Sequence, residues 1–186
     1  MLVKILIGVA ILVVALVVLI ATRPSDFRIV RTATMAAPAP VVFEQVNDFQ
    51  KWAAWSPWEK KDPAIRRTYG GPPEGGVGQT YAWAGNKEVG EGRMTLTESR
   101  PSELVRIKLE FFKPMAATHH AEFTFEPKGE QTAVTWSMTG RNNFVGKAFC
   151  LFMDMDKMVG GDFEKGLAAM KTVAESQAAP AQAAAH

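Results

Sequence analysis

Residues 104–139, LVRIKLEFFKPMAATHHAEFTFEPKGEQTAVTWSMT, contain three runs in which apolar and polar side chains alternate. A period of two is typical of β-strands that bury one face and expose the other. The pattern predicts strands at residues 104–112, 118–125 and 132–139, and Lys128-Gly129-Glu130 suits a tight hairpin between the last two. Successive strands of this kind favour an antiparallel meander with one apolar face.

Toward the N-terminus, residues 80–83 and 90–97 extend the meander to five strands, with Gly90-Glu91-Gly92 expected to form a bend or bulge. Residues 27–35 predict a first strand, ahead of the others. Residues 41–49 carry apolar side chains at helical spacing, and the aromatic segment WAAWSPW, residues 52–58, indicates a short helix that runs into a turn. The composition of residues 70–76, GGPPEGG, indicates a loop.

Toward the C-terminus, helical spacing returns over residues 143–177, with Phe163, Leu167 and Met170 on one face. Gly160-Gly161 is expected to kink or interrupt this helix, and Asp162 to cap its second half. The Ala-rich residues 178–186 are expected to fray as a disordered tail. This order of elements predicts an α+β helix-grip fold, in which a curved antiparallel sheet wraps around a long C-terminal helix.

The N-terminal segment, residues 2–22, is apolar apart from Lys4 and Thr22, and as a helix it would be about 30 Å long, enough to cross a bilayer core. We interpret residues 1–22 as a single-pass transmembrane anchor and residues 23–26 as a short linker. A cleaved signal peptide is the alternative, but IATRP at residues 20–24 is a poor small-x-small cleavage site. Arg23, Arg28 and Arg31 are expected to contact lipid headgroups. The flanking charges leave the side of the membrane undecided.

The remaining residues, 27–177, have the size of one ordinary domain. The chain carries 21 basic and 19 acidic residues. They alternate along it, which argues against a nucleic-acid partner. The single cysteine, Cys150, excludes an intrachain disulfide, and three histidines, one of them terminal, with no clustered ligands give no metal site. No phosphate loop or dinucleotide motif is present, so no cofactor is expected. The oligomeric state stays open.

Strand parity divides the side chains of the sheet between a water-facing set and a set that faces the C-terminal helix. Each inward residue could simply be core. Together, aromatic and methionine side chains leave irregular, adaptable space that suits a nonpolar ligand. The expected pocket residues are Trp55, Trp58, Tyr81, Trp83, Met94, Ile107, Leu109, Phe111, His119, Phe123, Trp136, Met138, Met155 and Met158.

His119 is the tentative catalytic candidate. It adjoins His120, so only one of the two can point inward, and the parity of Phe123 selects His119. A lone inward histidine is more often a core group than a catalyst. General acid/base chemistry would require a carboxylate or hydroxyl partner within hydrogen-bond reach, for which Tyr81 is the only suggestion. Glu110 and Glu122 fall on the polar face.

Several short motifs resemble the polyketide cyclase/dehydrase-like branch of the START and birch-pollen-allergen (SRPBCC) superfamily. They are VVFEQVNDF with Trp52 (residues 41–52), WSPW (55–58), WAGN with GEG (83–92), VTWSM (134–138) and DFEKGL (162–167). The resemblance implies a helix-grip fold with a cavity for lipids, polyketides or other hydrophobic molecules. It carries over no catalytic residue.

Three functions follow as hypotheses. The first is a membrane-anchored module that binds a hydrophobic or lipid-like molecule in an internal cavity. The second is a cyclase or dehydratase that uses His119. The third is a structural domain that docks a partner or the bilayer through residues 52–58. No catalytic constellation is identifiable, so the sequence leans away from an enzyme.

Overall fold

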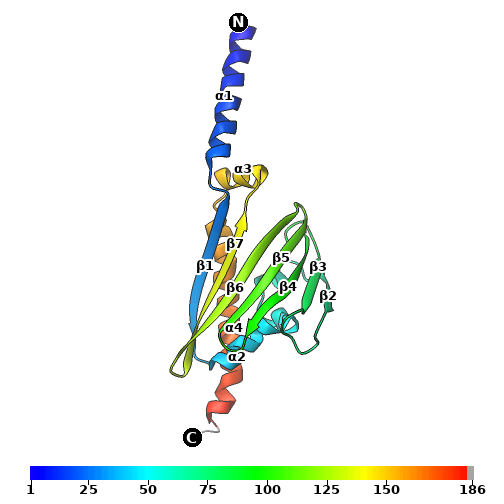
Figure 1. The fold of residues 1–186 in the computed structure, drawn as a ribbon, viewed down its shortest axis with the longest axis vertical. Helices are drawn as coiled ribbons and strands as arrows, with labels where there is room; N and C mark the ends of the chain where they lie inside the picture. Colours follow the sequence, from blue (N-terminus) through cyan, green and yellow to red (C-terminus); the bar gives the residue numbers. More distant parts are fainter. Residues whose placement is uncertain (184–186) are drawn as a thin grey trace.

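A computed structural model describes residues 1–183, in which seven antiparallel strands form one curved sheet (Figure 1). The strand order is β1-β7-β6-β5-β4-β3-β2, so the first strand pairs with the last. The bounds are β1 Asp26–Met35, β2 Arg66–Gly70, β3 Thr80–Ala84, β4 Glu91–Arg100, β5 Leu104–Lys113, β6 Ala117–Lys128 and β7 Gln131–Arg141. The predicted meander is confirmed. The short edge strand β2 was missed, because all five of its residues are exposed and show no burial pattern.

The helices cover one side of the sheet and its ends (Figure 1). Their bounds are α1 Leu2–Thr22, α2 Ala39–Asn47, two 3₁₀-helices at Phe49–Ala54 and Pro57–Lys60, α3 Phe144–Phe152 and α4 Met155–Ala183. The helix α4 packs along β1 and against α2, and α2 contacts β5, β6 and β7. This arrangement is the predicted α+β helix-grip fold.

The C-terminal helix is interrupted at a different place from the one expected. Its break lies at Met153, whose backbone is extended, and Asp154 Oδ1 accepts a hydrogen bond from Lys157 N (3.1 Å) at the start of α4. Gly160-Gly161 lies inside α4 and does not interrupt it. The absence of a side chain at Gly160 allows the helix to pack closely against the Arg31 side chain on β1. Asp162 caps nothing and instead pairs with Lys61 (2.5 Å).

The C-terminal end of α4 also differs from the prediction. The helix continues through the segment that was expected to fray, as far as Ala183, and Ala178 is buried. Burial of this alanine stabilises a turn that its sequence alone would leave marginal. Residues 184–186 of the predicted tail lie outside the described residues.

The bulge predicted at Gly90-Glu91-Gly92 is confirmed by a register shift between Glu91 and Gly92 in the β4–β5 pairing. Gly90 has a φ of 63°, and a Cβ there would meet the Lys113 carbonyl oxygen at 2.2 Å. Glycine is therefore required for the strands to curl at this end of the sheet.

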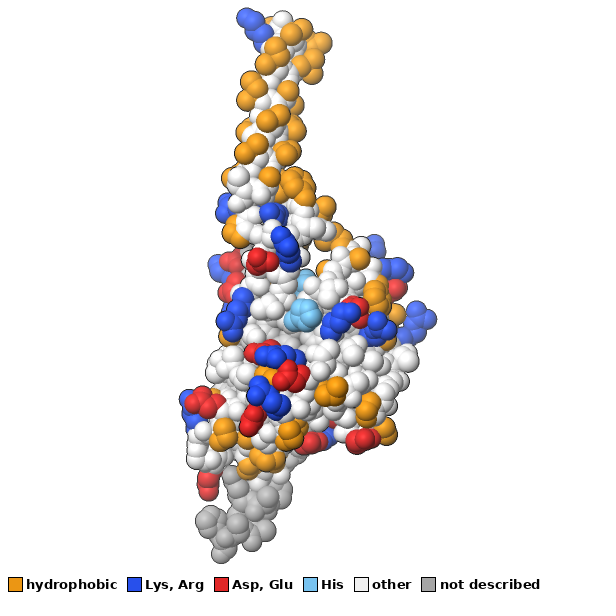
Figure 2. All heavy atoms as spheres, viewed as in Figure 1, with side chains coloured by type: hydrophobic (Ala, Val, Ile, Leu, Met, Phe, Trp, Pro, Cys, Tyr) orange, Lys and Arg blue, Asp and Glu red, His pale blue; other side chains and the backbone are white. Residues whose placement is uncertain are grey.

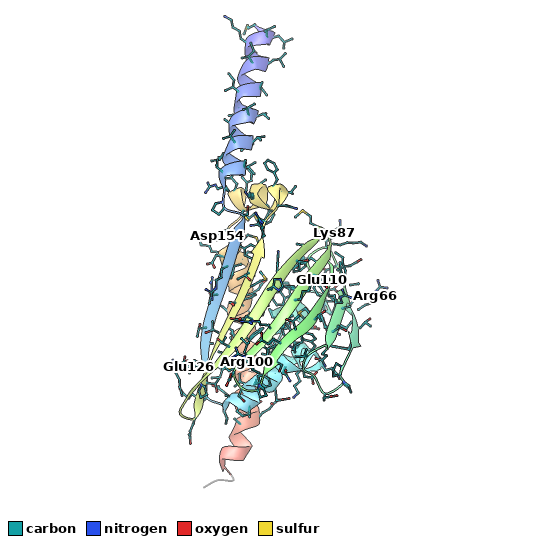
Figure 3. All side chains as sticks on the ribbon, viewed as in Figure 1. Arg66, Lys87, Arg100, Glu110, Glu126 and Asp154 are labelled. Carbon is teal, nitrogen blue, oxygen red and sulfur yellow. The ribbon has the colours of Figure 1, made fainter. Side chains whose placement is uncertain are left out.

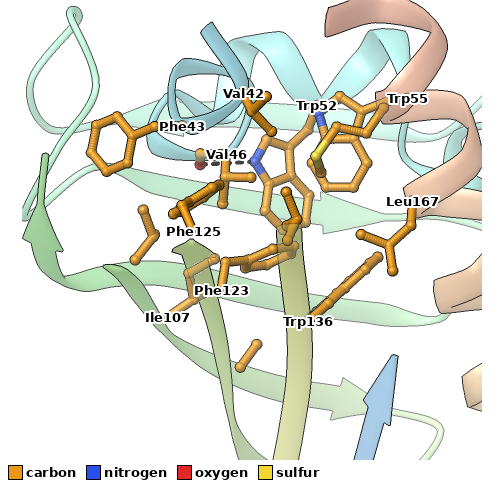
Figure 4. Close-up of a cluster of buried hydrophobic side chains, with 14 of the residues drawn as sticks. Val42, Phe43, Val46, Trp52, Trp55, Ile107, Phe123, Phe125, Trp136 and Leu167 are labelled. Atoms are coloured by element: carbon orange, nitrogen blue, oxygen red, sulfur yellow. Dashed lines mark hydrogen bonds between the residues drawn. The ribbon is translucent and has the colours of Figure 1, made fainter. Parts of the chain in front are cut away.

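Trp52 and Trp55 of the aromatic segment belong to the core (Figure 4), and Trp58 packs against it half-buried. Trp52 and Trp55 are buried, and their indole N–H groups donate to the carbonyl oxygens of Val46 (3.1 Å) and Gln45 (2.9 Å). Hydrogen bonding of both indoles allows these large rings to be buried without an unsatisfied polar group. Trp52 and Trp55 are therefore not available to dock a partner or the bilayer, as the third hypothesis requires.

The N-terminal helix α1 extends away from the body (Figure 1). Its mean hydropathy is 3.2 over the most apolar window, and only 6% of that window is buried. By length and composition α1 could cross a membrane, and a signal sequence would meet the same criteria.

Candidate ligand-binding site

The inner face of the sheet has the predicted parity. In β6, Ala121, Phe123 and Phe125 are buried, whereas His120 and Glu122 lie on the outer face. His119 is half-buried on the inner face and pairs in register with Gly140 of β7.

The middle of the inner face is closely packed. The rings of Trp136 on β7 and Phe163 on α4 are stacked with centroids 3.9 Å apart, and Phe123 stacks on the other side of Trp136 at 4.7 Å. Seven of the expected pocket residues are buried in this core: Trp55, Tyr81, Met94, Ile107, Phe123, Trp136 and Met138.

The other expected pocket residues are more accessible. Trp58, Trp83, Leu109, Phe111, His119 and Met155 are half-buried. Met158 is 43% exposed, because Val159, Phe163 and Leu167 occupy the face of α4 that packs on the sheet. The inner face is therefore filled at its centre and accessible toward the end where β5 turns into β6.

Four rings form a row across this accessible end, which we call the aromatic row: Trp83 of β3, Phe111 of β5, His119 of β6 and Phe27 of β1. Neighbouring centroids lie 5.7, 5.5 and 5.0 Å apart, with edge-to-face geometry. Edge-to-face contact is a favourable arrangement for such rings.

Two glycines on the intervening strands make room for the aromatic row. A Cβ at Gly92 of β4 would lie 2.4 Å from the Trp83 ring, and one at Gly140 of β7 would lie 2.5 Å from the His119 ring and 2.7 Å from Phe27. Phe27, Gly92 and Gly140 were not predicted as site residues. Glycine at two inward positions of otherwise bulky strands was the available signal.

His119 has an unusual environment for a polar group. Its Nδ1 is buried and has no hydrogen-bond partner. Burial, and then the charge of neighbouring His120, lowers the pKa of His119 below its ordinary value of 6.5. The imidazole is therefore neutral at pH 7 and presents an unused polar atom among apolar rings. An unpaired buried polar atom costs free energy and calls for a partner.

The suggested acid/base partner of His119 is engaged elsewhere. The Tyr81 hydroxyl donates to Glu59 Oε1 (3.0 Å), and Glu59 also pairs with Arg67. Burial and the Glu59 charge raise the pKa of Tyr81 well above its usual range. Within residues 1–183 no carboxylate or hydroxyl hydrogen-bonds to His119, so the geometry assembles no acid/base pair around it.

Two hollows lie outside the packed centre of the inner face. One, of about 330 Å³, is on the outer face of the sheet, where basic, acidic and histidine side chains gather (Figure 2); its lining includes Arg28, Thr97, Arg106, His120, Glu122, Ser137 and Thr139. The other, of about 410 Å³, is an open depression at the β5–β6 connection, beside Phe111 and Phe112. In the described part of the chain, no three His, Cys, Asp or Glu side chains are grouped to hold a metal ion.

A curved antiparallel sheet closing over a C-terminal helix defines the helix-grip class. The chain belongs to the family described as "Polyketide cyclase / dehydrase and lipid transport", whose model matches residues 26–175. This description associates the family with hydrophobic molecules. No curated protein matches the chain.

Solved structures share the fold at low identity. A protein from Thermobifida fusca is 21% identical, with 79% of this chain and 92% of that one covered and a TM-score of 0.60. Norcoclaurine synthase from Thalictrum flavum is 12% identical, with 82% and 95% covered and a TM-score of 0.59. The di-domain ARO/CYC protein of the steffimycin biosynthetic pathway is 12% identical, with 83% of this chain but 52% of that one covered, and a TM-score of 0.59.

Proposed function

We propose that this protein is a membrane-anchored module that binds a hydrophobic or lipid-like small molecule at the accessible end of its sheet. The observation that carries the proposal is the half-buried aromatic row, in which His119 Nδ1 has no partner. Apolar walls with one convergent polar atom are the usual composition of a small-molecule site.

The ligand would lie against Trp83, Leu109 and Phe111, which are half-buried on the inner face. If the ligand displaced the side chains that cover Nδ1 of neutral His119, a donor on the ligand, such as a hydroxyl, would pair with this unused atom. This contact would satisfy the buried atom and orient the molecule.

The anchor would keep this site close to lipid. If α1 spans a bilayer, the body stays within a few nanometres of a reservoir of nonpolar molecules. Tethering raises the effective concentration of such ligands without any new contact. Membership of a family that includes lipid transport supports this choice over a purely structural role.

Native mass spectrometry of the full chain after mild detergent extraction tests the proposal. We expect a nonpolar species to copurify, and Phe111→Ala to reduce its occupancy. Phe112→Ala, on the next residue and 52% exposed, is the matched control and should keep the wild-type occupancy. A wild-type protein that carries no nonpolar species, and takes up none when natural lipid extract is supplied, would contradict the proposal.

A further inference from the structure

The short helix α3 lies at the surface, and each of its residues is exposed or half-buried. None of its nine residues is buried. Its apolar residues form one arc of the helix: Phe144, Val145, Ala148, Phe149, Leu151 and Phe152. The opposite arc consists of Gly146, Lys147 and Cys150. Val145 is 56% and Phe152 77% exposed, so the apolar arc is not part of the protein core. An amphipathic helix with an uncovered apolar face requires another surface.

The position of α3 identifies that surface. The helix lies across the end of α1 and contacts it (Figure 1). Lys147 Nζ donates to the carbonyl oxygen of Ala21 (3.2 Å), at the last turn of α1. The apolar run of α1 ends at Thr22, so a bilayer spanned by α1 would have its boundary at this level.

The basic residues near α3 are also consistent with contact between this helix and the bilayer surface. Arg23 follows α1 directly, Arg141 lies two residues before Asn143, the N-cap of α3, and Lys147 is on the polar arc. None of these three forms an ion pair within residues 1–183. Unpaired basic residues beside exposed apolar ones are typical of helices that lie in a headgroup layer.

We infer that α3 is a second membrane contact, a helix lying in the plane of the bilayer with Phe144, Val145, Phe149 and Phe152 inserted at the headgroup–acyl boundary. This inference rests on the anchor proposed above. It goes beyond tethering, because one helix limits the distance of the body from the bilayer, whereas a second contact, made by a helix that lies across the end of the first, also restricts the orientation of the body.

That orientation would bring the accessible end of the sheet to the lipid surface. The α3–α4 junction at Asp154 and the β3–β4 connection at Lys87 both lie at the end of the body that faces α1 (Figure 3). The chain passes from Gly140, beside His119, to the N-cap of α3 within three residues. A nonpolar molecule could then move between the bilayer and the aromatic row over a short path.

The single cysteine provides the test. One fluorescent label is placed on native Cys150, on the polar arc, and another on Phe152→Cys in a Cys150→Ser background, on the apolar arc. Both full-length proteins are reconstituted into phosphatidylcholine–phosphatidylserine vesicles. We expect the label at residue 152 to be blue-shifted and quenched by doxyl-labelled lipid, and the label at residue 150 to be quenched by aqueous iodide instead.

The possible outcomes distinguish the proposed anchoring by α1 from the proposed membrane contact of α3. Chains that do not float with the vesicles on a density gradient would refute the anchor. Chains that float, with both labels equally open to iodide, would leave the anchor standing and overturn the role of α3. A label at residue 152 that is blue-shifted but unaffected by doxyl lipid would also overturn it, since a protein surface, such as a second copy, would then cover the helix.

Discussion

Trp136 of β7 and Phe163 of α4 lie ring on ring, with centroids 3.9 Å apart and planes inclined by 6°. The two residues are 2% and 1% exposed, so the sheet and the helix meet here without room for a ligand. A molecule bound on the inner face would therefore occupy its accessible end, or would have to displace one of these rings.

Phe163→Ala should remove the contact that joins the helix to the sheet. A buried Phe→Ala change typically costs about 3–5 kcal/mol, through lost burial and the cavity left behind. Chemical unfolding of the full chain in detergent, followed by tryptophan fluorescence, measures the loss. Phe112→Ala, at an exposed position, should change the free energy of unfolding by less than about 0.5 kcal/mol. Equal effects from the two variants would refute the packing described.

Adjacent glycines in α4 should respond oppositely to alanine. A Cβ at residue 160 would lie 2.1 Å from Arg31 Nη2, whereas a Cβ at residue 161 meets nothing within 4 Å. We expect Gly160→Ala to destabilise the protein by displacing Arg31 from Asp156 and Glu164. Gly161→Ala should stabilise it, by up to about 1 kcal/mol, because alanine is the better helix former. Thermal unfolding of both variants checks the sign, and a stabilising Gly160→Ala would contradict the close approach.

His119 should make the folded protein sensitive to mild acid. Its pKa is lowered by burial, so the unfolded chain binds a proton more readily than the folded one. The contribution of His119 to stability is complete above pH 6.5, its ordinary pKa, and is lost as the pH falls toward the lower folded value. The thermal midpoint should therefore drop on acidification, and His119→Phe should reduce that drop. His120→Phe, on the outer face, removes only the smaller cause of the lowered pKa and should keep most of the drop.

Leu109 should control access to the accessible end. It is half-buried beside the aromatic row, so Leu109→Trp would fill space that the proposed ligand needs. We expect this variant to fold and to copurify with less nonpolar material, as measured by native mass spectrometry. Lys108→Trp adds the same ring to the outer face and should retain the wild-type amount. If Leu109→Trp retained the wild-type amount of bound ligand, the ligand would not bind beside Leu109.

Gly140→Ala should disturb the aromatic row directly. The added methyl group would meet both His119 and Phe27, and overpacking of this kind typically costs about 1–3 kcal/mol. The expected results are a lower unfolding midpoint and a weaker hold on the copurifying species. Gly146→Ala in α3 is the comparison, since its nearest contact is the Asn142 side chain at 3.0 Å, which can shift.

Much of the fold could be predicted because it depends on local periodicity. Alternation in β4 to β7 identified the strands and assigned His119 to the inner face, and the apolar run of α1 is visible in composition alone. Strand β2 could not be found this way, since an exposed edge strand is held by backbone hydrogen bonds to β3 and not by a buried side-chain pattern.

The periods of the strands and helices, which can be read from the sequence, establish which residues face inward. Whether those residues enclose space or fill it was decided only by the tertiary structure. The stacking of Trp136 on Phe163, the room that Gly92 and Gly140 leave for the aromatic row, and the placement of α3 against the end of α1 all join residues far apart in the chain. Such contacts depend on how closely whole helices and strands pack against one another, and a local sequence pattern does not specify the distance between packed elements.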